Sequence, residues 1–268
     1  MNSQRHSAAF TMVEMLTVIA IIAIVASLVG PTVGHFRKGD TMLSASRQML
    51  DSVARARQLA ISQRTTVYMV FVPIDYWLDP PSGYWSSSDS IAATNLADKQ
   101  LTGYNYLSLR TVGDQPGRGF PRYLASWQTL PDSSFIDQDK FTISRGQYLT
   151  NLYLKSGLYV SGFDWSTNLP FPLAETQGYA GAQPPGGPYP RLPYIAFDYL
   201  GRLVSGHDEF IPLAHGSVTP STDANKKPVL TAAAFVRETP PGNSVDSYNV
   251  IHIDWLTGRA RLERQEIK

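Results

Sequence analysis

Cysteine is absent from this chain of 268 residues, and neither sign of charge is in clear excess. Without cysteine the chain has no disulfides and no thiolate metal ligands, so a folded domain must be held by its core alone. The 23 basic and 22 acidic side chains leave a formal net charge of +1. A nearly neutral chain has no global field that would draw it to nucleic acid or anionic lipid.

Motifs for catalysis are also missing. The sequence has no nucleophile elbow, no phosphate-cradling glycine loop and no repeat of fixed period. The densest candidate metal cluster is 207–209 with His215, but a polar turn before a strand explains this spacing better than a zinc site does. Asp137 and Asp139 could contribute to a calcium site, but the remaining oxygen ligands are not in register, which argues against one. We expect no catalysis, no resident metal and no cofactor.

A membrane-length apolar run occupies residues 9–30 and carries one charge, Glu14. From Phe10 to Gly30 a helix would span about 31 Å at 1.5 Å per residue, enough to cross the hydrocarbon layer. An ionised carboxylate in that layer is costly unless it finds a partner. Glu14 therefore needs an explanation.

The residues around Glu14 supply one. A short polar leader ends at Ala9 and is followed by Phe10, Thr11 and the apolar helix. This whole arrangement resembles the class III signal of type IV prepilins and type II secretion pseudopilins. The resemblance implies that prepilin peptidase cuts between Ala9 and Phe10, and that Phe10 is then N-methylated. It implies that Glu14 pairs with the terminal amine of a neighbouring subunit. Pro31 matches a helix-distorting proline of the family, whereas Ala9 stands where the family prefers glycine.

The resemblance also implies partners and a location. The precursor would be a single-pass protein of the bacterial inner membrane, surrounded by lipid, with its carboxyl-terminal domain in the extracytoplasmic space. After processing it would join other pilin or pseudopilin subunits in a filament, with the help of an inner-membrane assembly platform. Arg5 lies before the span and three basic or titratable residues follow it at 35–38, so charge counting alone would favour the reverse orientation. The expected orientation rests on the processing motif.

Two other interpretations of the amino terminus were weighed. An ordinary secretory signal needs a small-x-small cleavage site after the apolar run, and 26–28 is a poor version of it. A simple signal anchor would leave Glu14 as an unexplained cost.

A second helical pattern follows the apolar run. Apolar residues recur at steps of three and four: Met42, Ala45, Met49, Val53, Ala56 and Ala60. We expect a continuous helix from about Phe10 to Ser62, softened near Pro31, whose second half is amphipathic. The expected divisions are a leader at 1–9, a transmembrane and assembly helix at 10–33, an amphipathic stalk at 34–64 and a globular domain at 65–268.

The remainder indicates a β-rich domain. Nineteen prolines, twenty glycines and 11% aromatic residues are typical of a loop-rich β fold. The sequence predicts a buried strand at 65–72, and further strands at 194–198, 202–204, 208–213, 232–237, 248–255 and 259–263. Between them, about 73–190 is expected to be a large loop-rich insertion with short strands at 104–110, 141–144 and 152–160. The predicted fold class is α+β, a long amino-terminal helix packed on an antiparallel, pilin-like β domain.

The layout is similar to the H-type minor pseudopilins of type II secretion and to minor pilins of DNA-uptake systems. Beyond the amino terminus, the similarity rests on 195–201 and 251–259. In the uptake relatives a Gly-Arg-x-Arg element is implicated in contacting DNA, so Arg259, Arg261 and Arg264 are candidate phosphate contacts. Glu263 and Glu266 interrupt this basic patch, and arginines that protect a sheet edge are the competing interpretation.

Three functions remain at this stage. The leading hypothesis is a structural filament subunit, a minor one. The second is a DNA-binding minor pilin that uses the carboxyl-terminal arginines. The third is a membrane-anchored enzyme or carbohydrate-binding domain, in which aromatic residues of the insertion would stack on sugars.

Overall fold

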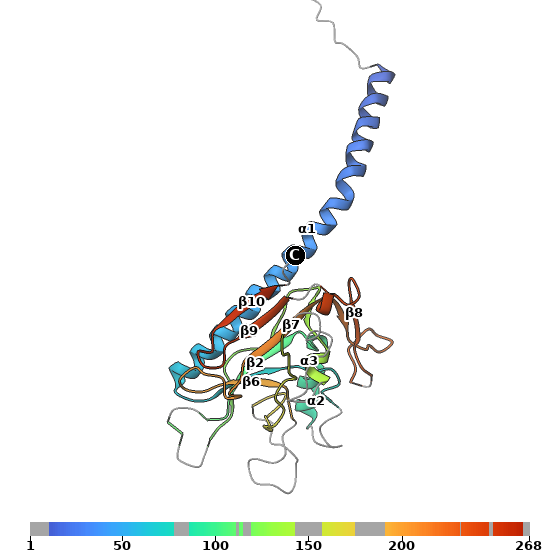
Figure 1. Cartoon of the computed structure of the whole chain (residues 1–268). Helices are drawn as coiled ribbons and strands as arrows, with labels where there is room; N and C mark the ends of the chain where they lie inside the picture. The colour runs from blue at the N-terminus through green and yellow to red at the C-terminus, as the bar shows by residue number, and fades with distance from the viewer. Residues whose placement is uncertain are drawn as a thin grey trace, which may run out of the picture. The chain divides into compact units, whose positions relative to one another are not determined.

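The computed structural model describes residues 11–77, 86–110, 113–114, 119–142, 157–174, 191–230, 232–246 and 249–264, and the side chains of 26–40 are not among those described. The chain divides into two units, Met1–Asp40 and Thr41–Lys268. The elements are α1 (Met12–Gln63), β1 (Val67–Phe71), α2 (Ser87–Thr94), η1 (Ala97–Lys99), β2 (Gly103–Ser108), β3 (Arg122–Tyr123), β4 (Gln128–Thr129), β5 (Ser134–Ile136), α3 (Asp139–Thr142), β6 (Tyr194–Phe197), β7 (Glu209–Thr219), β8 (Phe235–Glu238), α5 (Asn243–Asp246), β9 (Asn249–Ile253) and β10 (Ala260–Arg264) (Figure 1).

The second half of α1 buries the stripe that its sequence predicts. Five stripe residues are fully buried, namely Ala45, Met49, Val53, Ala56 and Ala60. Met42 is partly buried and packs against the same cluster. Three of the five are alanines, which let the helix backbone approach the sheets closely. The predicted amphipathic helix is therefore confirmed.

Two antiparallel sheets make up the β part of the domain. The first has the order β3-β2-β1-β6, with β4 also pairing β2, so β1 lies in its centre. Met69 of β1 is in register with Tyr106 of β2 on one side and with Ile195 of β6 on the other. The second sheet has the order β10-β9-β7-β5, and the far half of the long β7 pairs with β8. These sheets confirm the predicted α+β class.

The first sheet is buried on both faces. Val67, Met69 and Phe71 of β1 face the main core, together with the α1 stripe and the inner residues of the second sheet. Val70 and Val72, which point the other way, belong to a second cluster that includes Phe171 and Ala93 of α2. Because each face is covered, β1 is a continuous apolar run rather than an alternating one.

The expected loop-rich insertion at about 73–190 is not confirmed. Its described part supplies strands to both sheets, because β2 pairs with β1 and β5 pairs with β7. It also supplies the layer that covers the outer face of the first sheet. The strand predicted at 141–144 is wrong in its described part, because Phe141 and Thr142 lie in α3. Residues 157–160 are not in a strand, and 202–204 form a single bridge, Phe197 to Leu203.

The carboxyl-terminal hairpins follow the prediction closely. β9 and β10 form the expected closing hairpin, with Ile253 opposite Ala260. The segments 195–201 and 251–259, separated in sequence, meet through their glycines. Gly258 has a φ of +62°, and a Cβ placed on it would lie 2.0 Å from the carbonyl oxygen of Gly201. Arg57 of α1 donates from Nε to the carbonyl oxygen of Thr257 at 2.7 Å, which ties this pair of turns to the helix.

No helix in the described part of the chain is long and apolar enough to cross a membrane.

A fully buried ion pair joins α3 to the start of β7. The Lys140 ammonium donates to Glu209 Oε2 at 3.0 Å and to the carbonyl oxygen of Ser161 at 2.7 Å. It also lies 4.7 Å from the centre of the Phe163 ring. Burial lowers the pKa of Lys140, and the Glu209 carboxylate opposes that shift. The charge is thus tolerated in the core because its partners surround it.

Replacing Glu209 by Gln should destabilise the protein by about 3–5 kcal/mol, because the Lys140 charge would remain buried without its counter-charge. The double variant Lys140→Met/Glu209→Leu should recover most of the loss. Chemical unfolding of the full chain in detergent measures the free energy of unfolding of the single and the double variant. The control is Asp51→Asn on the exposed face of α1, and an equal effect of the control and of Glu209→Gln would contradict the prediction.

Asp137 gives the fold a second electrostatic feature. Its carboxyl is 6% exposed. Burial, with smaller contributions from the charges of Asp139 and Glu238, raises its pKa from 3.8 to about 6. The folded state therefore holds a proton between about pH 4 and 6 that the unfolded state has already released.

The Asp137 contribution to stability should be complete below about pH 4 and lost as the pH rises through about 6, because ionisation is disfavoured in the folded state. Asp137→Asn should remove this dependence and raise the free energy of unfolding near pH 7.5 by up to about 3 kcal/mol. Unfolding measured across pH 4 to 8 tests this. Equal pH profiles of the two proteins would contradict it.

Candidate assembly site at the amino terminus

The helix α1 begins with a capping box. Thr11 directly precedes the helix, and its hydroxyl accepts a hydrogen bond from the backbone N–H of Glu14 at 3.2 Å. The Glu14 carboxylate reaches back, and its Oε2 accepts from the Thr11 backbone N–H at 2.9 Å and from the Thr11 hydroxyl at 2.8 Å. Each side chain thus satisfies a backbone donor of the first turn that has no partner inside the helix.

The capping box fixes where the Glu14 carboxylate lies. In the described part of the chain all hydrogen bonds of this carboxylate use Oε2, which leaves Oε1 for a partner from outside that part. The carboxylate also lies in the first turn, where the helix dipole favours negative charge. Thr11 was missed as a site residue in the sequence, although Thr-x-x-Glu ahead of an apolar run is the signature of this cap.

The helix that follows the cap is apolar on all sides. Large hydrophobic side chains are exposed at nearly every position from residue 12 to residue 25: Met12, Val13, Met15, Leu16, Val18, Ile19, Ile21, Ile22, Ile24 and Val25. A helix in water normally confines such residues to one stripe. A surface of this kind requires cover from lipid or from other protein.

Three predicted site residues cannot be placed in this geometry. Ala9 and Phe10, on either side of the expected cut, lie outside the described residues. Pro31 lies within the backbone of α1, but its side chain is outside the described part.

The carboxyl-terminal arginines lie on or next to an edge strand. β10 is the outer strand of its sheet, and Arg259 directly precedes it. Arg261 is 68% exposed but is paired with Glu263, whose Oε1 accepts from Nη2 at 3.0 Å. Arg264 ends the strand and is exposed. The ion pair of Arg261 reduces the positive charge available to a phosphate.

Glu263 belongs to a larger network across the second sheet. Its Oε1 lies 2.7 Å from Nδ1 of His252, and Asp208 Oδ2 lies 2.8 Å from Nε2. Each ring nitrogen of His252 therefore lies within hydrogen-bond distance of a carboxylate oxygen. The ring also stacks on Phe210, with centroids 4.4 Å apart. His252 of β9 therefore links Glu263 of β10 with Asp208, which directly precedes β7.

The candidate metal clusters are dispersed by these contacts. Asp208 faces His252, while Glu209 pairs with Lys140. His215 Nδ1 lies 2.7 Å from the carbonyl oxygen of Thr239. Asp137 Oδ1 accepts from the backbone N–H of Asp139. Within the described ranges, no group of three His, Cys, Asp or Glu side chains is placed to hold a metal ion.

The closing turn of the β9–β10 hairpin is held by Asp254. Its Oδ1 accepts from the Thr257 hydroxyl at 2.6 Å and from the Thr257 backbone N–H at 2.7 Å, which lowers the pKa of Asp254. Arg259 and Arg261 therefore extend from a well-defined turn.

Comparison with known proteins agrees with the amino-terminal geometry. The model of the prokaryotic N-terminal methylation motif matches residues 4–30, a range that contains Thr11, Glu14 and most of the exposed apolar helix. No curated protein matches the chain, and no solved structure does. The match confirms the predicted prepilin-like signal. It supports a prepilin-like or pseudopilin-like amino terminus, of the kind that prepilin peptidase processes.

Proposed function

We propose that this protein is a structural subunit, a minor pseudopilin or pilin, that is cut before Phe10, methylated there and assembled into a filament. The observation that carries the proposal is the capped helix start: a single carboxylate, Glu14, heads an apolar helix that is exposed on all sides. Such a helix needs other chains or lipid around it. The methylation motif supports the processing step.

The transfer of the subunit from membrane to filament depends on the charge of Glu14. Before assembly the apolar helix lies in the inner membrane, where an ionised Glu14 is costly. During assembly the helix exchanges lipid for the helices of other subunits. Glu14 then gains the positive amino terminus of a neighbouring Phe10. A subunit displaced along the axis would leave both charges unmatched, so the pairing favours assembly and also sets its register.

The capping box prepares Glu14 for this role. Cleavage between Ala9 and Phe10 leaves the Thr11 backbone N–H intact, so the hydrogen bond to Oε2 survives processing. The carboxylate is thereby ordered before it meets a partner, which reduces the entropy lost on pairing. Oε1 is the atom we assign to the incoming amine.

The assignment to the H-type minor subunits is supported by the carboxyl-terminal half. The two segments that carry the resemblance, 195–201 and 251–259, pack on each other through Gly201 and Gly258 and on α1 through Arg57. The globular domain would lie on the filament surface in the extracytoplasmic space. A DNA-binding role receives less support, because Arg261 is paired with Glu263.

Processing is tested at the residue before the cut. Ala9→Leu should leave full-length precursor in the membrane, because a bulky side chain would not fit the peptidase site. Ala9→Gly, which introduces the residue that the family prefers, is the matched control and should be cut normally. Intact-mass spectrometry of the purified protein should show the first nine residues removed and one methyl group added. A mature chain that begins near Ser27 would instead support an ordinary secretory signal.

Two substitutions distinguish the charge-pairing role of Glu14 from its helix-capping role. Glu14→Gln keeps an oxygen that can cap the helix but removes the charge. It should reduce incorporation into filaments by roughly tenfold or more, since an amine in an apolar layer loses its counter-charge. Thr11→Ala keeps the charge and removes part of the cap, so it should have a much smaller effect. The ratio of protein in sheared filaments to protein in membranes measures both.

The pairing mechanism fails if Glu14→Gln assembles normally while Thr11→Ala does not, because capping alone would then explain the requirement for Glu14. Cleavage should be unaffected in both variants, and their amino-terminal masses serve as the control.

A further inference from the structure

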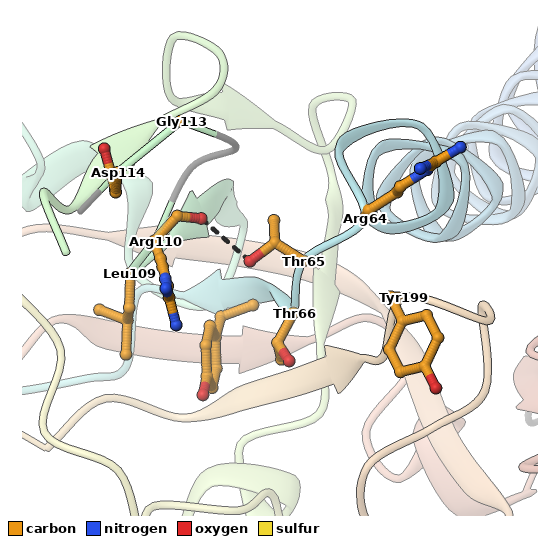
Figure 2. Close-up of a pocket in the computed structure, with 9 residues that line it drawn as sticks. Arg64, Thr65, Thr66, Leu109, Arg110, Gly113, Asp114 and Tyr199 are labelled. Atoms are coloured by element: carbon orange, nitrogen blue, oxygen red, sulfur yellow. Dashed lines mark hydrogen bonds between the residues drawn. The ribbon is translucent and has the colours of Figure 1, made fainter. Parts of the chain in front are cut away.

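A pocket of about 550 Å³ lies where α1 ends and the first sheet begins. Its lining includes Arg64, Thr65, Thr66, Tyr68, Arg110 and Tyr199. Figure 2 shows Arg64 at the end of the helix and Arg110 on the other side of the Thr65–Thr66 segment. The volume is that of a small-molecule site.

The pocket lining contains two arginines, Arg64 and Arg110. In the part of the chain that the structure describes, neither guanidinium lies within ion-pair distance of a carboxylate. The described lining holds one acid, Asp114, against these two arginines. The lining therefore has an excess of positive charge.

Arg64 occupies a backbone position that disfavours its side chain. The Arg64 N–H donates to the carbonyl oxygen of Ile61 and the Thr65 N–H to that of Ala60, which is the Schellman pattern that ends a helix. Arg64 has the left-handed residue of this pattern, with a φ of +48°. Glycine is usual there because any Cβ is strained.

A favourable interaction with the helix dipole does not explain why arginine occupies this left-handed position. A cation near the carboxyl end of a helix is favourable, but the same charge at Gln63 would give this benefit with ordinary helical geometry. Backbone strain retained at one residue is a reason to look for a function of its side chain.

Hydrogen bonds fix the backbone at Arg110, and two tyrosines complete the lining. The Thr65 hydroxyl donates to the carbonyl oxygen of Arg110 at 2.9 Å, as the dashed line in Figure 2 shows. The Ser108 hydroxyl donates to the same oxygen. Burial raises the pKa of Tyr68, so its hydroxyl stays protonated and can donate. Tyr199 is 57% exposed and offers its ring to solvent.

We propose that this pocket binds an acidic saccharide, with Arg64 and Arg110 on its carboxylate or phosphate group and the Tyr199 ring against the sugar. Arginines and hydroxyls are suited to planar or tetrahedral oxyanions. Arg64 extends outward from the rim in Figure 2, so its guanidinium would have to turn inward about its flexible stem to meet a ligand held by Arg110. The exposed ring adds a stacking surface for the sugar. This function is additional to filament assembly and does not depend on it.

The test is calorimetric titration of the full chain in a polyoxyethylene detergent. The probes are glucuronate and glucose 6-phosphate, which separate a carboxylate ligand from a phosphate ligand, and glucose is the neutral control. We expect saturable binding of at least one anionic sugar, at least about tenfold tighter than glucose. Binding should weaken as salt rises to about 0.5 M, because the attraction is between charges near the surface.

Arg64→Gly gives two readouts of opposite sign. It should weaken binding about tenfold or more through loss of a charged hydrogen bond, and it should raise the melting temperature by a few degrees through relief of the left-handed strain. Arg110→Gln should also weaken binding. Arg122→Gln, an exposed arginine on β3 outside the pocket, should change neither quantity.

The proposal is overturned if the wild-type chain binds neither anionic sugar, or binds glucose equally well. It is also overturned if Arg64→Gly binds as tightly as wild type, or if Arg64→Gly lowers the melting temperature. Because the last readout concerns stability alone, it tests the strain argument independently of any ligand.

Discussion

The fold depends on one packing contact, between the buried stripe of α1 and the inner faces of the two sheets. Ala45, Ala56 and Ala60 let the helix backbone approach closely, and Met49 and Val53 fill the space between them. With no cysteine to form cross-links, the two sheets are held together mainly through this shared surface. The turns that meet at Gly201 and Gly258 extend the contact, since Arg57 of the same helix donates to the adjacent carbonyl of Thr257.

The sequence predicts the parts of this arrangement that follow a period. The helix stripe repeats at three and four residues and agrees with the structure, and the predicted closing hairpin is present as β9 paired with β10. The prediction fails where local composition does not reveal whether a segment is a surface loop or a buried strand. Proline and glycine clusters at 73–190 suggested an insertion, yet β2 pairs with β1 in the centre of a sheet. Nothing local marks β2 as central, because its position depends on long-range pairing.

The site residues show the same division. Glu14 stands out in the sequence because a charge in an apolar run is costly, while its hydrogen bonds with Thr11 needed only a local pattern that was overlooked. Arg64 could not be recognised, since the sequence does not reveal that the helix ends there with a left-handed residue. The pairing of Arg261 with Glu263 could be predicted from the sequence, because residues two apart on a strand point the same way. The contacts of His252 with Glu263 and Asp208 could not be predicted, because they depend on how strands distant in sequence pair.

Among the described residues, some charged side chains are paired within the domain, whereas Glu14 is not. Lys140 and Glu209 are buried in the domain and pair with each other, so they contribute to one fold and leave no requirement for another molecule. Glu14 is different, because large apolar side chains are exposed along its helix and, within the described residues, the hydrogen bonds of its carboxylate use Oε2 alone. In the function proposed above, this carboxylate would specify where a second chain must place a positive charge. Assembly can therefore be encoded at the amino terminus, while the surface of the globular domain remains available for a ligand.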